Sequence, residues 1–133
     1  MGDLYAAGGR WDLAEAQFKT ETVLQPGDGE AAYKLGNALL QQGKVKEARA
    51  ELLRSNRLRP HSAETLYLAG KTASLEGDGK EAEKAWVELL GIEKETALAA
   101  QAHFGLATLY RQQGNAAKAA DEMKEYQRLQ KVK

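Results

Sequence analysis

The segment AYKLGNALLQQGKVKEARAELLRSNRLRP, residues 32–60, determines the fold of this chain of 133 residues. Its second glycine, Gly43, has equivalents 34 residues to either side, Gly9 and Gly77, and a fourth, Gly114, follows 37 residues after Gly77. A period in this range is typical of chains that fold by stacking one supersecondary unit on copies of itself. The segment is therefore one unit of a repeat architecture.

Other features of the unit recur in phase with these glycines. A small residue recurs at Ala14, Ala48, Ala82 and Ala119, and a bulky residue follows four positions after each of them, at Phe18, Leu52, Trp86 and Met123. The only two prolines, Pro26 and Pro60, are also 34 residues apart. The period therefore belongs to the whole unit and not to the glycines alone.

Apolar spacing predicts that each unit is a helix, a glycine turn and a second helix. Within residues 28–42, Ala32, Leu35 and Leu39 fall at helical intervals with polar residues between them. Gly43 then supplies a tight break, since glycine tolerates the positive φ that ends a helix. We expect helices near residues 3–8, 11–24, 29–42, 45–58, 63–76, 79–90, 96–113 and 116–131. The sequence thus predicts an all-α stack of four helix pairs.

The breaks between units have a different chemistry. Pro26 and Pro60 cannot continue a helix interior, because proline lacks the amide donor and clashes with the preceding turn. Asp28 and Ser62, just beyond them, are good N-cap residues whose oxygens accept from free backbone amides. These positions mark where the next unit begins.

The third junction, residues 91–96, lacks the proline and breaks the period by three residues. Three residues are close to one helical turn, so the following helix can begin a turn earlier without changing its buried face. A longer loop is the other alternative. We expect the stacking geometry to deviate most here.

The recurring residues resemble the tetratricopeptide repeat, whose pattern is W-x2-L-G-x2-Y, then A-x3-F, then P. The matches, repeat by repeat, are Met1, Gly2, Tyr5, Ala14, Phe18 and Pro26; Ala32, Leu35, Gly36, Leu39, Ala48, Leu52 and Pro60; Leu66, Ala69, Gly70, Ala73, Ala82 and Trp86; and His103, Leu106, Ala107, Tyr110, Ala119 and Met123. The resemblance covers nearly the whole chain. It implies a right-handed α-solenoid, a single domain over 1–133 with repeats near 1–28, 29–62, 63–98 and 99–133, the first of them truncated.

The physical roles of the matched residues follow from close packing. Gly36 and Gly70 let the first helix of a repeat approach the second closely, and Ala48 and Ala82 keep the opposing surface flat. The bulky residue four places after each alanine fills the gap between neighbouring repeats. These positions form the seam of the stack.

In tetratricopeptide domains the first helices line a concave groove that binds peptides or extended segments. Helical phase predicts as groove residues Tyr33, Lys34, Asn37 and Gln41 in repeat two, Tyr67, Leu68, Lys71 and Ser74 in repeat three, and Phe104, Thr108, Arg111 and Gln112 in repeat four. Aromatic rings with interspersed lysine and arginine suit an extended peptide, since they bury apolar side chains and donate to carbonyls or a carboxylate.

Two alternatives remain for this groove. Tyr33, Tyr67 and Phe104 occupy equivalent positions, and either form an aromatic ladder along the groove or pack between neighbouring first helices. Some members of the family hold a C-terminal carboxylate with a clamp of lysines, asparagines and an arginine. Asn37 matches the first asparagine of that clamp, but Tyr33 and Leu68 replace a lysine and an asparagine. The sequence therefore disfavours the clamp.

Composition excludes several classes of function. Nineteen basic and nineteen acidic residues give a net charge of zero, which argues against nucleic acid as a partner. The chain has no cysteine, and its apolar stretches are too short to span a bilayer. His61 and His103 have no metal-ligand spacing; we expect His61 to be solvated in a turn and His103 to be a satisfied core histidine. We expect no catalytic residue, no metal and no cofactor.

The sequence thus predicts a protein-interaction module that binds a peptide or partner protein in its groove without catalysis. The alternatives are a structural or oligomerisation segment, and the non-catalytic repeat region of a larger multidomain protein or enzyme. The first repeat lacks most of its opening helix and no polar cap follows the last one. Self-association through these uncapped ends would cover their apolar faces.

Overall fold

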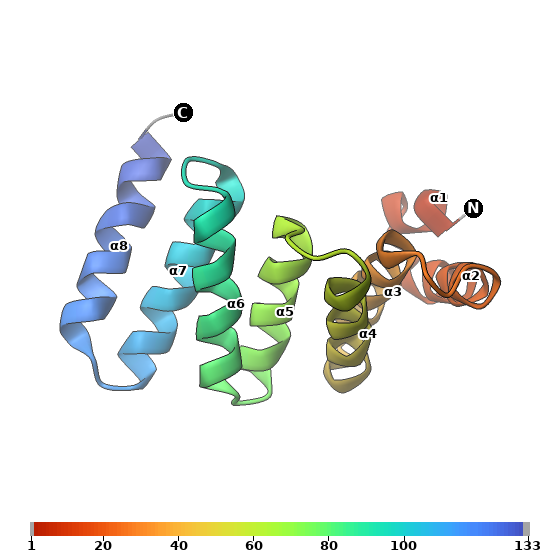
Figure 1. Cartoon of the computed structure of the whole chain (residues 1–133), viewed down its shortest axis with the longest axis horizontal. Coiled ribbons are helices and arrows are strands. Elements are labelled where there is room, and N and C mark those ends of the chain that lie inside the picture. Colours follow the sequence, from red (N-terminus) through yellow and green to blue (C-terminus); the bar gives the residue numbers. More distant parts are fainter. Residues whose placement is uncertain (1, 132–133) are drawn as a thin grey trace.

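The computed structural model describes residues 2–131 and contains, over that range, eight α-helices and no strand. They are α1 (Gly2–Ala7), α2 (Trp11–Leu24), α3 (Gly29–Gln41), α4 (Val45–Leu58), α5 (Ala63–Leu75), α6 (Gly79–Ile92), α7 (Ala97–Gln112) and α8 (Ala116–Lys131). Figure 1 shows them side by side in chain order, from α1 and α2 at one end to α8 at the other. The predicted helices are confirmed, with every boundary within two residues. Met1, assigned above to the first repeat, lies outside the described residues.

The turn within each helix pair is built on a glycine in the left-handed region. Gly9, Gly43, Gly77 and Gly114 have φ between +78° and +80°, which other residues adopt only with strain. In the second pair the amide of Lys44, just after Gly43, donates to the Leu39 carbonyl at 3.0 Å. The glycine turns predicted from the period are confirmed.

The turns between pairs carry the predicted caps. The Asp28 carboxylate accepts from the amides of Glu30 and Ala31, and the Ser62 hydroxyl accepts from the amide of Thr65. His61, which follows Pro60, is exposed and has φ of +67°. It is the one residue other than glycine with positive φ in the described chain, and its equivalent in the first repeat, Gly27, does not have positive φ.

The three extra residues of the third junction lie in α7 and not in a loop. The linker between α6 and α7 spans residues 93–96, and the earlier linkers, 25–28 and 59–62, are of equal length. In contrast, α7 has 16 residues where α3 and α5 have 13. Of the two alternatives, the structure therefore has the longer helix, with one additional turn at its start, capped by Thr96.

The seam residues pack as expected. Leu52 and Trp86 are 0% and 4% exposed, and a β-carbon built on Gly36 would lie 2.8 Å from Leu52 Cγ. The Trp86 indole lies so close to Gly70 that a side chain there would overlap it. Its Nε1 donates to the Tyr67 carbonyl at 3.2 Å. Each of these two bulky seam residues thus packs closely against the backbone of the first helix of its own repeat.

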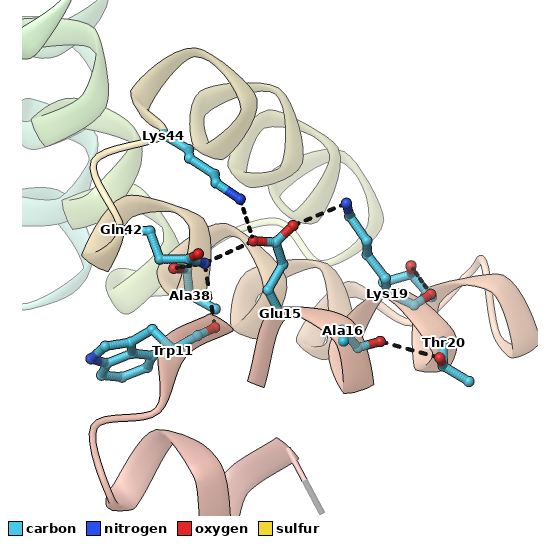
Figure 2. Close-up of polar contacts among 9 residues, drawn as sticks. Trp11, Glu15, Ala16, Lys19, Thr20, Ala38, Gln42 and Lys44 are labelled. Atoms are coloured by element: carbon cyan, nitrogen blue, oxygen red, sulfur yellow. Dashed lines mark hydrogen bonds and ion pairs between the residues drawn. The ribbon is translucent and has the colours of Figure 1, made fainter. Parts of the chain in front are cut away.

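A buried carboxylate joins the first two repeats next to the seam. Glu15, 8% exposed, accepts hydrogen bonds from Lys44 Nζ and Gln42 Nε2, both at 2.8 Å, and pairs with Lys19 at 2.9 Å. Figure 2 shows these three side chains converging on it. The hydrogen bonds from Lys44 and Lys19 lower the pKa of Glu15 from 4.5 to about 2, against the opposing effect of burial. Glu15 is therefore ionised at neutral pH.

The next junction has the same geometry with the charges reversed. Arg49, the equivalent of Glu15, contacts Glu76 at 3.0 Å and Asp78 at 2.6 Å, and these occupy the positions of Gln42 and Lys44. At the third junction the equivalent residue, Glu83, accepts from the Tyr110 hydroxyl at 2.6 Å. Each junction thus has its own polar pairing, which disfavours a shifted stacking of the repeats.

Candidate groove site

The first helices of the pairs form the inner side of the curved stack. Besides contacting the second helices, α3 contacts α5 and α5 contacts α7. Helices on the inside of a curved stack come closer to one another than helices on the outside. The surface of α3, α5 and α7 is therefore the concave groove of the solenoid.

Eleven of the twelve predicted groove residues are exposed or half-buried, and Leu68 is not. At 8% exposure, its side chain packs beside Ala69 against Leu52 in the core. The physical reason is helical phase, because Tyr67 and Leu68 are adjacent and point about 100° apart. Leu68 therefore supports the groove from inside instead of lining it.

Lys34 and Gly105, the equivalents of Leu68, show what this position does. The Lys34 ammonium lies 6.0 Å from the centre of the Phe18 ring, and Gly105 lies against the Trp86 indole. In each case the position faces the bulky seam residue of the preceding repeat. Gly105 makes room for the large indole, since a β-carbon there would lie 2.8 Å from Trp86 Cη2.

The aromatic residues divide between packing and exposure. Tyr33 and Tyr67 are half-buried against the core between neighbouring first helices, and burial raises the pKa of both hydroxyls. Phe104 is 44% exposed and stacks at a tilt on Tyr126 of α8, with ring centroids 5.1 Å apart. Packing between first helices thus accounts for the buried parts of both tyrosines, whereas Phe104 presents an open ring.

A shallow pocket of about 240 Å³ lies between α5 and α7 on this face. Five predicted groove residues line it together with three others, and the full set is Tyr67, Lys71, Ser74, Phe104, Thr108, Trp86, Gln101 and Gly105. The sequence analysis assigns Trp86 to the seam alone and does not place Gln101 or Gly105 in the groove. The glycine at position 105, where the preceding repeat has Leu68, is the signal that indicates the exposure of Trp86 to the groove.

The groove cations differ in their surroundings. Lys34 Nζ lies 3.0 Å from Asp3 of α1 and 4.0 Å from Glu30, and the hydrogen bond to Asp3 raises its pKa. Lys71 and Arg111 have no carboxylate within salt-bridge distance among residues 2–131. Lys34 is thus neutralised within the chain, and the two cations further along the groove are not.

The remaining polar groove residues are only partly engaged. Gln41 donates to Asn37 Oδ1 at 3.3 Å, and the Thr108 hydroxyl donates to the Phe104 carbonyl one turn earlier. Ser74 and Gln112 line a second shallow hollow near the glycine turn of the third pair. The groove therefore offers hydroxyl and amide groups on both sides of the pocket.

The model of the tetratricopeptide repeat family matches residues 1–63 and 67–131. The chain belongs to this family. Members of the family serve as scaffolds for protein–protein interaction, and that role extends to this chain. No curated protein sequence matches it significantly.

Solved structures of MamA share the fold. One crystal structure of MamA superposes with a TM-score of 0.91 at 22% identity, over 98% of this chain and 75% of that one. MamA from residue 41 to its end, from Desulfovibrio magneticus RS-1, superposes with a TM-score of 0.91 at 21% identity, over 100% of this chain and 73% of that one. These similarities confirm the predicted α-solenoid.

Of the two histidines of this tetratricopeptide repeat protein, His61 is solvated as expected, and His103 has a polar partner as expected but is half-buried and not in the core. His103, half-buried in α7, pairs through Nδ1 with Glu122 of α8 at 2.5 Å, and His61 is exposed in its turn. Within residues 2–131, no three His, Cys, Asp or Glu side chains gather closely enough to hold a metal ion. No helix of that range has the length and apolar character needed to cross a membrane.

Proposed function

We propose that this chain binds an extended segment of a partner protein in its concave groove and performs no catalysis. One observation carries the proposal: the pocket between α5 and α7 is lined by residues of two adjacent repeats, Tyr67 and Lys71 from one and Phe104 and Thr108 from the next. A site that spans a repeat junction exists only in the assembled stack.

The chemistry of the pocket fits a peptide side chain. Its walls are the rings of Tyr67 and Phe104, and its floor is the Trp86 indole beside Gly105. Aromatic walls bury an apolar side chain, and a few polar groups at the rim fix its orientation. The open groove on either side leaves room for the peptide backbone.

The ionisable side chains near the groove support binding without catalysis. His103, which pairs with Glu122, and Lys34, which pairs with Asp3, do not line the pocket. The other polar side-chain groups that line the pocket with Lys71 are the hydroxyls of Tyr67, Ser74 and Thr108, the Gln101 amide and the Trp86 indole nitrogen. The pocket lining contains no carboxylate and no imidazole that could act as a general base or activate a nucleophile.

The test is selection of peptides from a random display library on the immobilised full chain, followed by affinity measurement. We expect Phe104→Ala and Lys71→Ala to weaken the selected peptides by about tenfold each. Lys46→Ala, an exposed lysine on α4 outside the groove, is the matched control. If the affinity survives both groove substitutions, binding lies elsewhere and the proposal fails.

The partial exposure of Met123 in α8 favours a second candidate, a segment that assembles with another copy. Met123 is half-buried, whereas its equivalents Phe18, Leu52 and Trp86 are at most 4% exposed. Static light scattering over a range of concentrations tests it. A mass that rises with concentration, and that falls back in Met123→Lys, supports assembly through α8.

A further inference from the structure

The first helices of repeats three and four carry an unusual distribution of charge. In α7 there is no acidic residue, and in α5 the single acid, Glu64, lies in the first turn. The second helices α6 and α8 alternate acids and bases along their length. In a chain of zero net charge, this half of the groove is therefore selectively cationic.

The positions of Lys71 and Arg111 along their helices can be compared through the turn glycines of the repeats. Lys71 and Thr108 are equivalent, each six residues before its turn glycine, Gly77 or Gly114. Arg111 is three residues beyond Thr108 and so lies one turn further along the same face of α7. Both cations therefore lie towards the glycine turns.

The apolar part of the pocket lies on the other side. Tyr67 and Phe104 are equivalent and precede Lys71 and Thr108 by four residues, which is about one helical turn. One turn corresponds to roughly 5–6 Å along the axes of α5 and α7. An extended chain covers this distance in about two residues.

From this geometry we propose that the groove recognises an acidic extended segment in which a large apolar residue and an Asp or Glu stand two positions apart. The apolar side chain enters between Tyr67 and Phe104 above the Trp86 indole, and the carboxylate pairs with Lys71. A second acid further on meets Arg111. This inference rests on the proposed groove function and names its partner class.

Charge complementarity is the reason to expect an acidic segment in the pocket between α5 and α7. A lysine without an internal partner, beside the apolar walls of a shallow pocket, favours a carboxylate over a neutral or basic side chain. In repeat two, Lys34 is already paired with Asp3 and therefore does not favour a carboxylate of the ligand. The acidic end of the ligand is therefore expected over repeats three and four.

The test uses peptides selected on the full chain from a random library. We expect the selected sequences to be enriched in Leu, Phe or Trp two positions from Asp or Glu. In a selected peptide, Glu→Gln should weaken binding by about tenfold, the scale of a charge-assisted hydrogen bond. Lys71→Glu in the protein should weaken it at least as much, while Lys46→Glu on the outer helix α4 leaves it unchanged.

A charge exchange separates a specific pair from general attraction. A peptide carrying Glu→Lys should bind the Lys71→Glu protein more tightly than the wild-type chain. If selected peptides lose affinity on Phe104→Ala but show no acidic enrichment and ignore Lys71→Glu, the groove function stands and the acidic partner class is wrong. If binding ignores Phe104→Ala as well, the groove function itself fails.

Discussion

Gly105 of α7 lies against the indole of Trp86 of α6, so closely that a β-carbon on Gly105 would come within 2.8 Å of Cη2. The indole is held on its other side by Gly70 and by its hydrogen bond to the Tyr67 carbonyl. This contact both closes the seam between repeats three and four and provides the floor of the groove pocket. The stability of the stack and the shape of its binding surface therefore depend on the same pair.

Gly105→Ala should destabilise the protein in one background and stabilise it in another. With Trp86 in place the new methyl group meets a fixed ring, and overpacking costs about 1–3 kcal/mol. In a Trp86→Leu background the methyl group has space, and replacing a helical glycine contributes about 0.5–1 kcal/mol. Urea unfolding of the four proteins measures both values.

Gly91→Ala is the control for this cycle, because a β-carbon there meets nothing within 4 Å. It should be stabilising in both backgrounds. An equal effect of Gly105→Ala on the free energy of unfolding with and without Trp86 would show that the indole does not restrict the side chain at position 105.

Glu15 should make stability depend on acid pH. Its folded pKa of about 2 lies below the ordinary 4.5, so its contribution is present above the unfolded pKa and is lost as pH falls from about 5 to about 2. At pH 7 Glu15→Gln should lower the free energy of unfolding by up to about 3 kcal/mol. The difference between wild type and variant should shrink towards zero at low pH.

Asp121→Asn is the matched control, since Asp121 is exposed on α8. Its effect should stay within about 0.5 kcal/mol at both pH values. A Glu15→Gln effect that is independent of pH would mean that the charge of Glu15 is not what stabilises the junction.

Reversing the first junction should reproduce the second. Lys44→Asp alone brings a carboxylate beside Glu15 and should be destabilising. Adding Glu15→Arg creates the pairing that Arg49 and Asp78 form one repeat later, and should recover most of the loss. We expect a coupling of about 0.5–3 kcal/mol in the double-mutant cycle; strictly additive effects would contradict the equivalence of the two junctions.

His61→Gly should stabilise the turn between α4 and α5. The left-handed conformation of His61 is strained by about 1–2 kcal/mol, and glycine removes that strain at some loss of unfolded-state entropy. The net gain should be about 0.5–1 kcal/mol by thermal or urea unfolding. Gly27, at the equivalent position of the first repeat, does not have positive φ and has room for a side chain, so Gly27→His should bring no such strain. A loss of stability in His61→Gly would show that the turn does not carry the strain.

How much the sequence predicts differs between the fold and the site. The glycine turns, the Asp28 and Ser62 caps and the seam contacts each depend on one residue type at one repeat position, so the period predicts them. The extra turn of α7 was open between two alternatives, because three residues fit either a helix or a loop. In the structure the three residues extend α7, which is capped by Thr96.

The site depends on contacts between repeats, which a single unit does not contain. Lys34 is neutralised by Asp3, 31 residues away, and no local pattern indicates that pair. Leu68 faces inward because a one-residue step rotates the side chain by about 100°. Trp86 reaches the groove because Gly105 lacks a side chain, which becomes evident only when equivalent positions of three repeats are compared.

The groove can be tested directly through the two tryptophan indole signals in a proton–nitrogen NMR spectrum. Trp86 forms the floor of the pocket between α5 and α7, whereas Trp11 lies in α2 near the other end of the stack (Figure 1). Titration with a selected acidic peptide should shift the Trp86 signal with a saturable dependence and leave the Trp11 signal in place. Saturable binding that moves the Trp11 signal, or neither signal, would contradict the account.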